Sequence, residues 1–407
     1  MRPLAVVFTV MLIVSACPRQ QAGQQASSAA VPTPAPALTV TLVRSDLGLG
    51  DGQFVREADA LLSELAADGR LTYLPVGTLP VGLTLEAGFG DVGLPRAGLT
   101  GPGEMTVTEG EELLAGVTDT DWLVLSSPLL LSAALARLDA GEFSARLILV
   151  LDEDGLGELP DTPPVPVYAL SYDIRPVAFV CGLVAAASSN NGMFTIMAAE
   201  TDPRAQDFLD GAWAGAKYQT NGAVAAVMLL PVDEETGVLS PATYQRMLEA
   251  KQRQMGPYFA CNHYILALGR ATPSILHALS QHPVAGYVVG AYADYRAVRP
   301  ARILGCALKH PGAALRFVLN EHLGGRELSD LADDSGLIQV GLDQQAIGFT
   351  DFDLYTRHNP DGDDLAEEVS SVWAEIEVGE LDVPELIERY LDSEAPAPAE
   401  SMPAAAE

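Results

Sequence analysis

Short apolar runs alternate with amphipathic stretches from residue 38 onward, and this rhythm predicts a series of strand–helix units. In the first half, the apolar runs predict strands at residues 38–43, 71–77, 121–127, 145–152 and 164–173. The stretches between them predict helices at residues 54–67, 111–116 and 129–141. Residues 79–108 are rich in Gly, Pro and Leu without helical periodicity, so we interpret them as an inserted surface loop.

The second half repeats the same alternation. It predicts strands at residues 192–200, 224–232, 258–269, 286–292 and 302–308. It predicts helices at residues 175–188, 202–219, 241–256, 272–283 and 312–325. Alternating units of this length favour parallel, doubly wound sheets, and about ten strands are too many for one ordinary open sheet. We therefore expect two α/β lobes.

The two ends of the chain carry different signals. Arg2 precedes a short apolar run, and Ser15-Ala16 stands before Cys17, which predicts a signal peptide at residues 1–16 and lipidation of Cys17. Residues 17–37 mix Gln, Ser, Ala and Pro, as expected for a flexible tether behind a lipid anchor. A plain signal peptide with an incidental cysteine is the alternative. Residues 392–407 form an acidic, Pro- and Ala-rich tail that we expect to be disordered.

Composition excludes several function classes. The chain has 407 residues and a formal net charge of −31, so a nucleic-acid partner is excluded by repulsion. Its six histidines are scattered, and no cluster has metal-ligand spacing, so we expect neither a metal nor a cofactor. Three further cysteines, Cys181, Cys261 and Cys306, stand among apolar residues and are interpreted as buried thiols, although one disulfide among them stays open.

The turn after the first strand carries the first functional signal. Its layout of strand, glycine-rich turn and helix is that of a phosphate-binding loop, but the turn has no lysine and contains Asp46 and Asp51. These carboxylates would repel a phosphate. A carboxylate near the aromatic ring of Phe54 suits a neutral ligand that offers hydrogen-bond donors and a flat face.

Four stretches in fixed order resemble a known family. They are the opening turn and helix, the helix at 175–188, the helix at 202–219 and the segment "GAYADYRAVRPARILGCALK". The matching positions are Asp51, Phe54, Ala58, Phe179, Gly182, Ala185, Phe208, Gly211, Ala214, Gly215, Lys217, Tyr218, Asp294 and Lys309. Behind a lipidation motif, this order resembles the basic membrane protein family of substrate-binding lipoproteins, which serve ABC importers and mostly bind purine nucleosides.

The resemblance implies a type I periplasmic-binding fold, in which three crossovers join two lobes with parallel sheets and a ligand binds between them. The first lobe is expected at residues 38–170 with 292–325 returning, and the second at 171–291 with 326–391. The implied function is that of a lipid-anchored importer component on the outer side of the cell membrane, with an ABC permease as partner. It implies no catalysis.

The resemblance and the residue pattern together nominate a ligand site. Its members are Asp51, Phe54, Ser126, Trp213, Tyr292, Asp294 and Lys309. Five of them have a structural alternative: Asp51 as a helix cap, Asp294 as a stabiliser of a crossover, and the three aromatic residues as core. Ser126, at a strand end, has no paired histidine in the sequence pattern, which argues against a hydrolase.

Three departures from the family leave the ligand open. Val55 replaces an Asn, Val238 stands where a second stacking Phe is expected, and Tyr292 replaces the ribose-binding aspartate 17 residues before Lys309. A flavin such as riboflavin is therefore an alternative ligand. A structural or signalling lipoprotein that has lost the nucleoside site is the alternative function.

Overall fold

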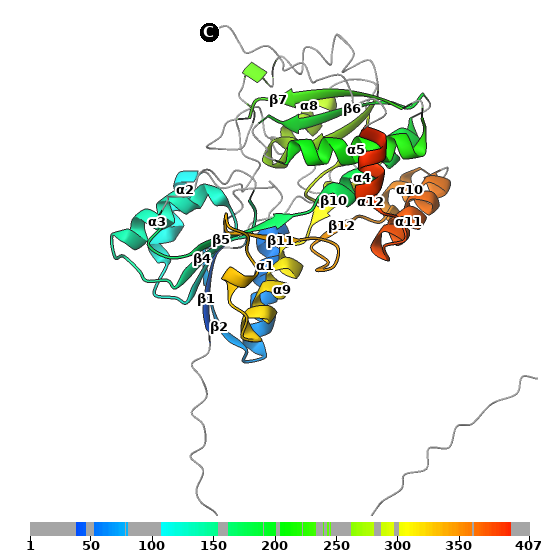
Figure 1. The fold of residues 1–407 in the computed structure, drawn as a ribbon. Coiled ribbons are helices and arrows are strands. Elements are labelled where there is room, and N and C mark those ends of the chain that lie inside the picture. The colour runs from blue at the N-terminus through cyan, green and yellow to red at the C-terminus, as the bar shows by residue number, and fades with distance from the viewer. Residues whose placement is uncertain are drawn as a thin grey trace, which may run out of the picture. The chain divides into compact units, whose positions relative to one another are not determined.

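The computed structural model describes two sheets with their helices (Figure 1). The described residues are 38–45, 53–77, 79, 107–153, 162–189, 191–200, 204–221, 223–232, 239, 242–243, 245, 262–280, 286–296, 301–359 and 362–391. The predicted signal peptide, Cys17, the tether, the opening turn with Asp51, Val238, Cys261 and the acidic tail lie outside this set. Within it, no helix is both long and apolar enough to cross a bilayer.

The first sheet has six strands in the order β11-β5-β4-β3-β1-β2, and every neighbouring pair is parallel. Its strands are β1 (Leu38–Val43), β2 (Leu71–Val76), β3 (Trp122–Leu125), β4 (Leu147–Val150), β5 (Val167–Tyr172) and β11 (Leu337–Val340). The central strands β3 and β4 are buried along their whole length, as expected for a parallel sheet covered on both faces.

The second sheet also has six strands, in the order β12-β10-β9-β8-β6-β7. They are β6 (Met193–Ala199), β7 (Val224–Leu230), β8 (His263–Ala267), β9 (Tyr287–Gly290), β10 (Ile303–Lys309) and β12 (Ile347–Phe349). Five of them run parallel, and the edge strand β12 pairs antiparallel with β10. The second sheet is thus mixed, whereas the first is wholly parallel.

Helices connect and cover the strands. They are α1 (Gln53–Ala67), α2 (Val107–Leu113), α3 (Leu131–Asp139), α4 (Arg175–Ser188), α5 (Ala205–Gln219), α8 (Thr272–Ser280), α9 (Pro311–Leu323), α10 (Asp353–His358), α11 (Asp363–Glu377) and α12 (Val383–Leu391). Single 3-10 turns lie at Leu114–Gly116, Pro128–Leu130, Gly269–Ala271 and Leu328–Asp330. In the described part, α9 packs on α1, and α4 packs on α5, α11 and the second sheet.

The chain passes between the two sheets three times. It leaves the first sheet after β5 and enters α4, returns after β10 through α9, and crosses again between β11 and β12. This topology confirms the expected fold class, a type I periplasmic-binding arrangement of two lobes and three crossovers. The returning segments differ from the expected ranges, because β10 belongs to the second sheet and β11 to the first.

Close packing of α4 against α5 accounts for several residues of the family-like motifs. A Cβ atom on Gly182 would lie 1.7 Å from the carbonyl oxygen of Ala212, and one on Gly215 would lie 1.8 Å from that of Phe179. Only glycine allows this approach, so both glycines have a structural reason independent of any ligand. Helix α4 is buried from Pro176 to Ala186, which explains its apolar character on all sides.

Two of the three core cysteines lie in the described part and confirm the interpretation as buried thiols. Cys181 in α4 and Cys306 in β10 are both free and fully buried. Burial disfavours the thiolate and raises the pKa of both side chains, that of Cys306 to about 12. Neither thiol is therefore a nucleophile at neutral pH.

Candidate functional site

The candidate site lies where strands of both sheets reach their carboxyl ends, the usual ligand position in doubly wound sheets. In the first sheet, Ser126 follows β3, Asp152 lies two residues after β4, and Tyr172 ends β5. In the second sheet, Tyr292 lies two residues after β9 and Lys309 ends β10. The topology therefore brings side chains from distant parts of the sequence to one region.

Lys309 is the centre of this region. Its side chain is only 2% exposed, and its Nζ donates to Oδ1 and Oδ2 of Asp152 at 3.0 and 3.2 Å. The same Nζ lies 4.6 Å from the ring centroid of Tyr292 and 5.2 Å from that of Tyr172. A buried ammonium is tolerated here because a carboxylate and two aromatic rings surround it.

Two further aromatic rings extend the group. Phe54, at the start of α1, packs tilted against Tyr172 with the centroids 6.1 Å apart. Phe208, in α5, meets Tyr292 edge to face at 5.9 Å. The Tyr172 hydroxyl donates to the Leu151 carbonyl at 2.9 Å, which fixes that ring. The result is an aromatic row with Lys309 in its middle, and we call these five residues with Asp152 the Lys309 cluster.

Tyr292 has a backbone conformation that is uncommon for its residue type. Its φ is +76°, in the left-handed region that bulky side chains rarely occupy. The Tyr292 carbonyl accepts a hydrogen bond from the backbone N–H of Lys309 at 3.5 Å. A strained residue held beside a buried lysine is typical of a functional site, where surrounding contacts maintain a conformation that the residue alone disfavours.

A second ion pair lies directly beside the first. Glu153, next to Asp152, accepts from Arg204 Nε at 2.6 Å and from the Ser171 hydroxyl at 2.7 Å. Arg204 also pairs with Asp207 at 2.8 Å and contacts Ser171. Burial alone would lower the pKa of Arg204, but the charges of Glu153 and Asp207 raise it above its ordinary value. Arg204 therefore stays charged.

Ser126 has a structural role in the described part. Its hydroxyl donates to the Ser45 carbonyl at 2.5 Å and approaches the Val43 carbonyl at 3.4 Å, which ties the end of β3 to the end of β1. The side chain of the next residue, Ser127, accepts from the Leu129 N–H at 3.2 Å and caps a 3-10 turn. Both hydroxyls are thus used in shaping the strand ends.

Asp294 lies four residues after β9, a strand of the second sheet. Its carboxylate accepts from Arg296 Nε at 2.9 Å and Nη2 at 2.8 Å. Arg296 also donates to the Asp351 carboxylate after β12 at 2.5 Å. Burial lowers the pKa of Arg296, but the two aspartates more than compensate and raise it. This network links the segment after β9 to the segment after β12.

Trp213 lies apart from the Lys309 cluster along the chain of α5. The residue stands eight positions after the helix start, about 12 Å along the axis from the end that faces the strand termini. Lys217 lies over its ring at 4.5 Å from the centroid. Its buried indole N–H has no acceptor among the described residues. Phe208, one turn from the helix start, is the aromatic residue of α5 that reaches the cluster.

The structure brings together Phe54, Tyr292 and Lys309 of the nominated residues. The sequence pattern did not indicate Asp152, Glu153, Tyr172 or Arg204 as site residues, and Phe208 appeared only as a motif position. One signal was available: Asp152 follows the apolar run "LILVL" as Lys309 follows "ILGCAL". A charge at the end of a buried strand needs a partner, and these two charges have opposite signs.

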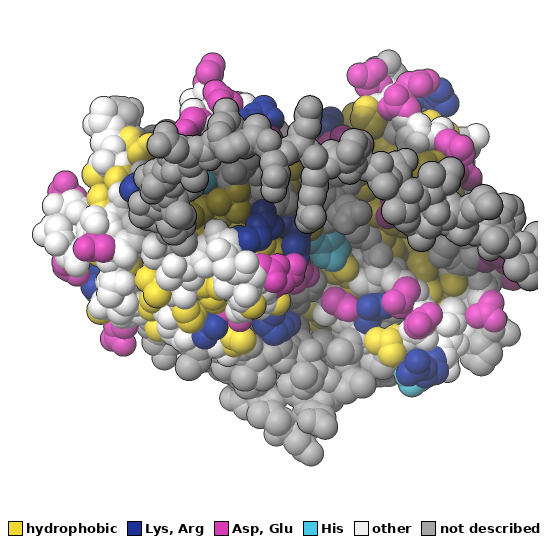
Figure 2. All heavy atoms as spheres, turned by 90° about the horizontal axis from the view of Figure 1, so that it is seen from below, with side chains coloured by type: hydrophobic (Ala, Val, Ile, Leu, Met, Phe, Trp, Pro, Cys, Tyr) yellow, Lys and Arg dark blue, Asp and Glu magenta, His cyan; other side chains and the backbone are white. Residues whose placement is uncertain are grey.

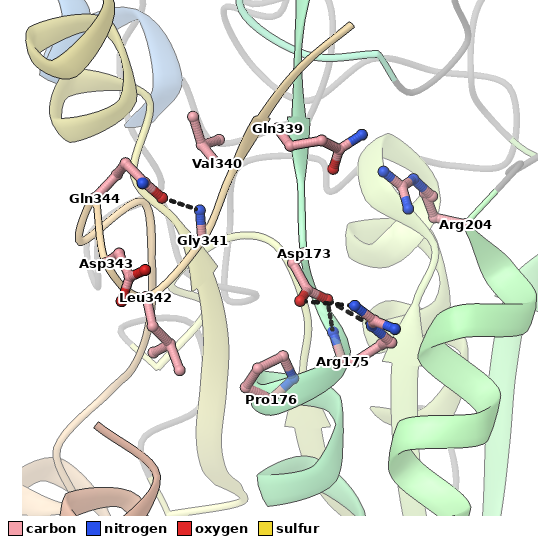
Figure 3. Close-up of a pocket in the computed structure, with 10 residues that line it drawn as sticks. All are labelled: Asp173, Arg175, Pro176, Arg204, Gln339, Val340, Gly341, Leu342, Asp343 and Gln344. Carbon is pink, nitrogen blue, oxygen red and sulfur yellow. Dashed lines mark hydrogen bonds and ion pairs between the residues drawn. The ribbon is translucent and has the colours of Figure 1, made fainter. Parts of the chain in front are cut away.

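A cavity of about 440 Å³ lies between the first and third crossovers (Figure 3). Arg175 and Arg204 line it together with Asp173, Gln339 and Gln344. Arg175 is bound by Asp173 through two hydrogen bonds of 2.7 and 2.9 Å, and Gln344 accepts from the Gly341 N–H at 2.8 Å. Each arginine of the lining is thus held by a carboxylate, while Pro176, Val340 and Leu342 add apolar side chains to the cavity. In the described part, no group of His, Cys, Asp and Glu side chains could hold a metal ion.

Comparison with known proteins finds similarity to solved structures alone. No family model and no curated protein matches the chain. An ABC transporter solute-binding protein from Aeropyrum pernix K1 is 15% identical, with a TM-score of 0.47 over 88% of this chain and 92% of its own. A transcriptional activator of the comK gene from Bacillus halodurans is 14% identical, with a TM-score of 0.49 over 83% and 97%.

A 5-methylthioribose transporter solute-binding protein from Thermotoga lettingae is 14% identical. Its TM-score is 0.43 over 88% of this chain and 98% of its own. The three similar structures thus include both transport and transcription proteins.

Proposed function

We propose that this chain is the substrate-binding component of an ABC importer, which captures a small heteroaromatic solute between its two lobes. The observation that carries the proposal is the Lys309 cluster, where rings from both sheets flank a buried lysine–carboxylate pair. Flat rings of Tyr172 and Tyr292 suit a planar ligand, and the pair between them offers one donor and one acceptor.

The three crossovers give this receptor its movement. Each lobe has its own sheet, so the lobes can rotate about the crossovers as rigid bodies. A solute that contacts both lobes stabilises the closed form relative to the open one, and that difference is what a permease could recognise. Such a receptor binds one solute per chain and does not convert it.

A purine nucleoside is the solute that the family resemblance favours. Tyr292 stands where the family has its ribose-binding aspartate, and its ring lies against Lys309. The exchange favours ligands recognised through their heterocycle, so riboflavin is the alternative solute. A lipoprotein that has lost the solute site is the second candidate function, because Lys309 and Asp152 bond to each other directly.

The anchor is part of the proposal. Cys17, lipidated behind the signal peptide, would hold the receptor at the outer side of the cell membrane, with residues 17–37 as tether. Fractionation of cells expressing wild type or Cys17→Ser tests it. Release of the variant from membranes is expected, and equal retention would contradict the anchor.

Mass spectrometry of small molecules released on denaturing the purified protein tests the solute. A stoichiometric heteroaromatic compound is expected from protein purified without added ligand. Titration calorimetry with inosine, guanosine, adenosine, their bases and riboflavin then ranks the classes. No released compound and no binding across the panel would favour the lipoprotein without a solute site.

A further inference from the structure

Two consecutive acidic residues, Asp152 and Glu153, each hold a cation from the other lobe. Asp152 bonds to Lys309 at 3.0 and 3.2 Å, and Glu153 bonds to Arg204 at 2.6 Å. The side chains of Asp152, Glu153 and Lys309 are all at most 8% exposed. Because each positive charge is balanced by its own carboxylate, the region between the lobes offers no uncompensated cation from these pairs.

We propose that Asp152 is a specificity-determining residue, which makes the site accept uncharged solutes and reject their phosphorylated or carboxylated forms. This inference rests on the proposed function, since it concerns the same site. An anion that reaches Lys309 either displaces Asp152 or lies beside it. Displacement leaves a buried carboxylate without its cation, and coexistence brings two negative charges together, so both arrangements are costly.

The ring positions strengthen the argument. The Nζ of Lys309 lies over the rings of Tyr172 and Tyr292, so a solute that reaches either ring also reaches the Lys309–Asp152 pair. An uncharged edge with a donor and an acceptor can bond to the carboxylate and the ammonium without disturbing their charge balance.

The charge of the whole protein acts in the same direction. The chain has a formal net charge of −31, and Figure 2 shows acidic side chains spread over one face of the molecule. A field of this sign lowers the local concentration of anionic solutes. That effect is shared by all acidic residues and is screened by salt, whereas the effect of Asp152 is local and persists at high ionic strength.

Four proteins test the inference: wild type, Asp152→Asn, the double variant Asp152→Asn/Lys309→Met, and Glu64→Gln as a control. Glu64 forms an exposed ion pair with Arg316 at 2.7 Å, so its variant removes the same charge far from the site. The probes are inosine with inosine 5′-monophosphate, riboflavin with riboflavin 5′-phosphate, and inorganic phosphate. Calorimetry and thermal unfolding are run at constant, high ionic strength.

We expect wild type and Glu64→Gln to bind inosine or riboflavin at least a hundredfold more tightly than the phosphorylated form of the same compound. Asp152→Asn should narrow this ratio at least tenfold and gain stabilisation by inorganic phosphate, because Lys309 then lacks its carboxylate. The double variant should gain none. Equal wild-type affinity for both members of a pair would overturn the inference, as would a phosphate response of Asp152→Asn no larger than that of wild type.

The phosphate titration separates this inference from the proposed function. If no variant binds any organic solute, the proposed function fails, while a phosphate gain confined to Asp152→Asn still supports the charge-selecting role. If Asp152→Asn folds only in phosphate, the role is supported, because the anion replaces the missing carboxylate. If Asp152→Asn folds neither with nor without phosphate while the double variant folds, Lys309 cannot accept an external anion, and the inference is overturned.

Discussion

The ammonium of Lys309 and the carboxylate of Asp152 form a buried ion pair between residues 157 positions apart in the chain. Lys309 ends β10 of the second sheet, and Asp152 follows β4 of the first. We predict that Asp152→Asn and Lys309→Met each destabilise the protein by about 3–5 kcal/mol, because each leaves one buried charge alone.

The double variant Asp152→Asn/Lys309→Met should be destabilised by clearly less than the sum, since neither charge remains. Equilibrium denaturation of the four proteins measures the coupling. Additive losses would mean that the two side chains do not depend on each other.

The contact between Gly182 and Ala212 gives a prediction about the fold. Gly182→Ala should destabilise the protein by about 3 kcal/mol or more, at the upper end for overpacked cores, because the added methyl meets a backbone carbonyl and not a flexible side chain. Gly341→Ala is the control, since its Cβ would lie 3.6 Å from the nearest atom, an ordinary contact. Similar thermal unfolding of both variants would show that α4 and α5 can separate at little cost.

Phe54 has two possible roles, packing in the hydrophobic core and contact with the solute, which different substitutions can separate. It is 5% exposed and packs on Tyr172, so truncation to Ala would cost core stability as well as contact with a solute. Phe54→Leu keeps most of the volume and removes only the ring. We predict that it weakens binding of the co-purified solute by about 0.5–1.5 kcal/mol, the value of an aromatic contact beyond burial.

The control for Phe54→Leu is Leu61→Val, a core change two turns further along the same helix. It should lower stability without changing the dissociation constant measured by calorimetry. Equal effects of the two variants on affinity would assign Phe54 to the core alone.

The titration of His263 makes the free energy of unfolding depend on pH. Burial lowers the pKa of its imidazole, which stacks on Tyr287 at a centroid distance of 5.3 Å. The unfolded chain therefore binds a proton more readily, so stability present above pH 6.5 is lost as the pH falls below it. The loss is about 1.4 kcal/mol for each unit by which the pKa is lowered.

His263→Phe keeps an aromatic ring at this position and removes the titration. The difference in unfolding free energy between wild type and this variant should change between pH 7 and 5, in the sense that wild type loses more. A constant difference across that range would show that His263 titrates alike in both states.

Much of the fold could be predicted because its signals are local. Each long buried strand forms an apolar run, and α1 shows the expected periodicity, so the alternation of the first ten strands is visible in the sequence. The strands β11 and β12 have four and three residues, respectively. Runs this short have no clear period, so the residue pattern predicted neither strand nor the antiparallel edge, and the third crossover was expected only from the family resemblance.

The site was predicted less completely because its pairings are not local. Lys309 was nominated as a motif position, but its partner is fixed only by the order of strands in two sheets. Trp213 was nominated as a candidate for ring stacking, and the sequence pattern could not show that it stands two turns from the helix start. The motif glycines Gly182 and Gly215 proved to serve helix packing.

Tyr292 leads to a prediction about ligand class. Its hydroxyl can donate one hydrogen bond and its ring offers a face, whereas an aspartate would bind a ribose diol through two charge-assisted bonds. We therefore predict that wild type binds a free base or riboflavin within about tenfold of any nucleoside, a gap of about 1.4 kcal/mol. Tyr292→Asp should shift the preference toward nucleosides, and aspartate also tolerates the backbone φ of +76° better than tyrosine does.

Tyr292→Phe is the matched control for that shift, because it keeps the ring over Lys309 and removes only the hydroxyl. Calorimetry with inosine, guanosine and adenosine beside their free bases measures the ratio in the three proteins. We expect the ratio to rise in Tyr292→Asp and to stay near the wild-type value in Tyr292→Phe, since recognition through the ring is unchanged. A hundredfold preference of wild type for nucleosides would contradict the prediction, because another residue would then bind the ribose in place of the aspartate.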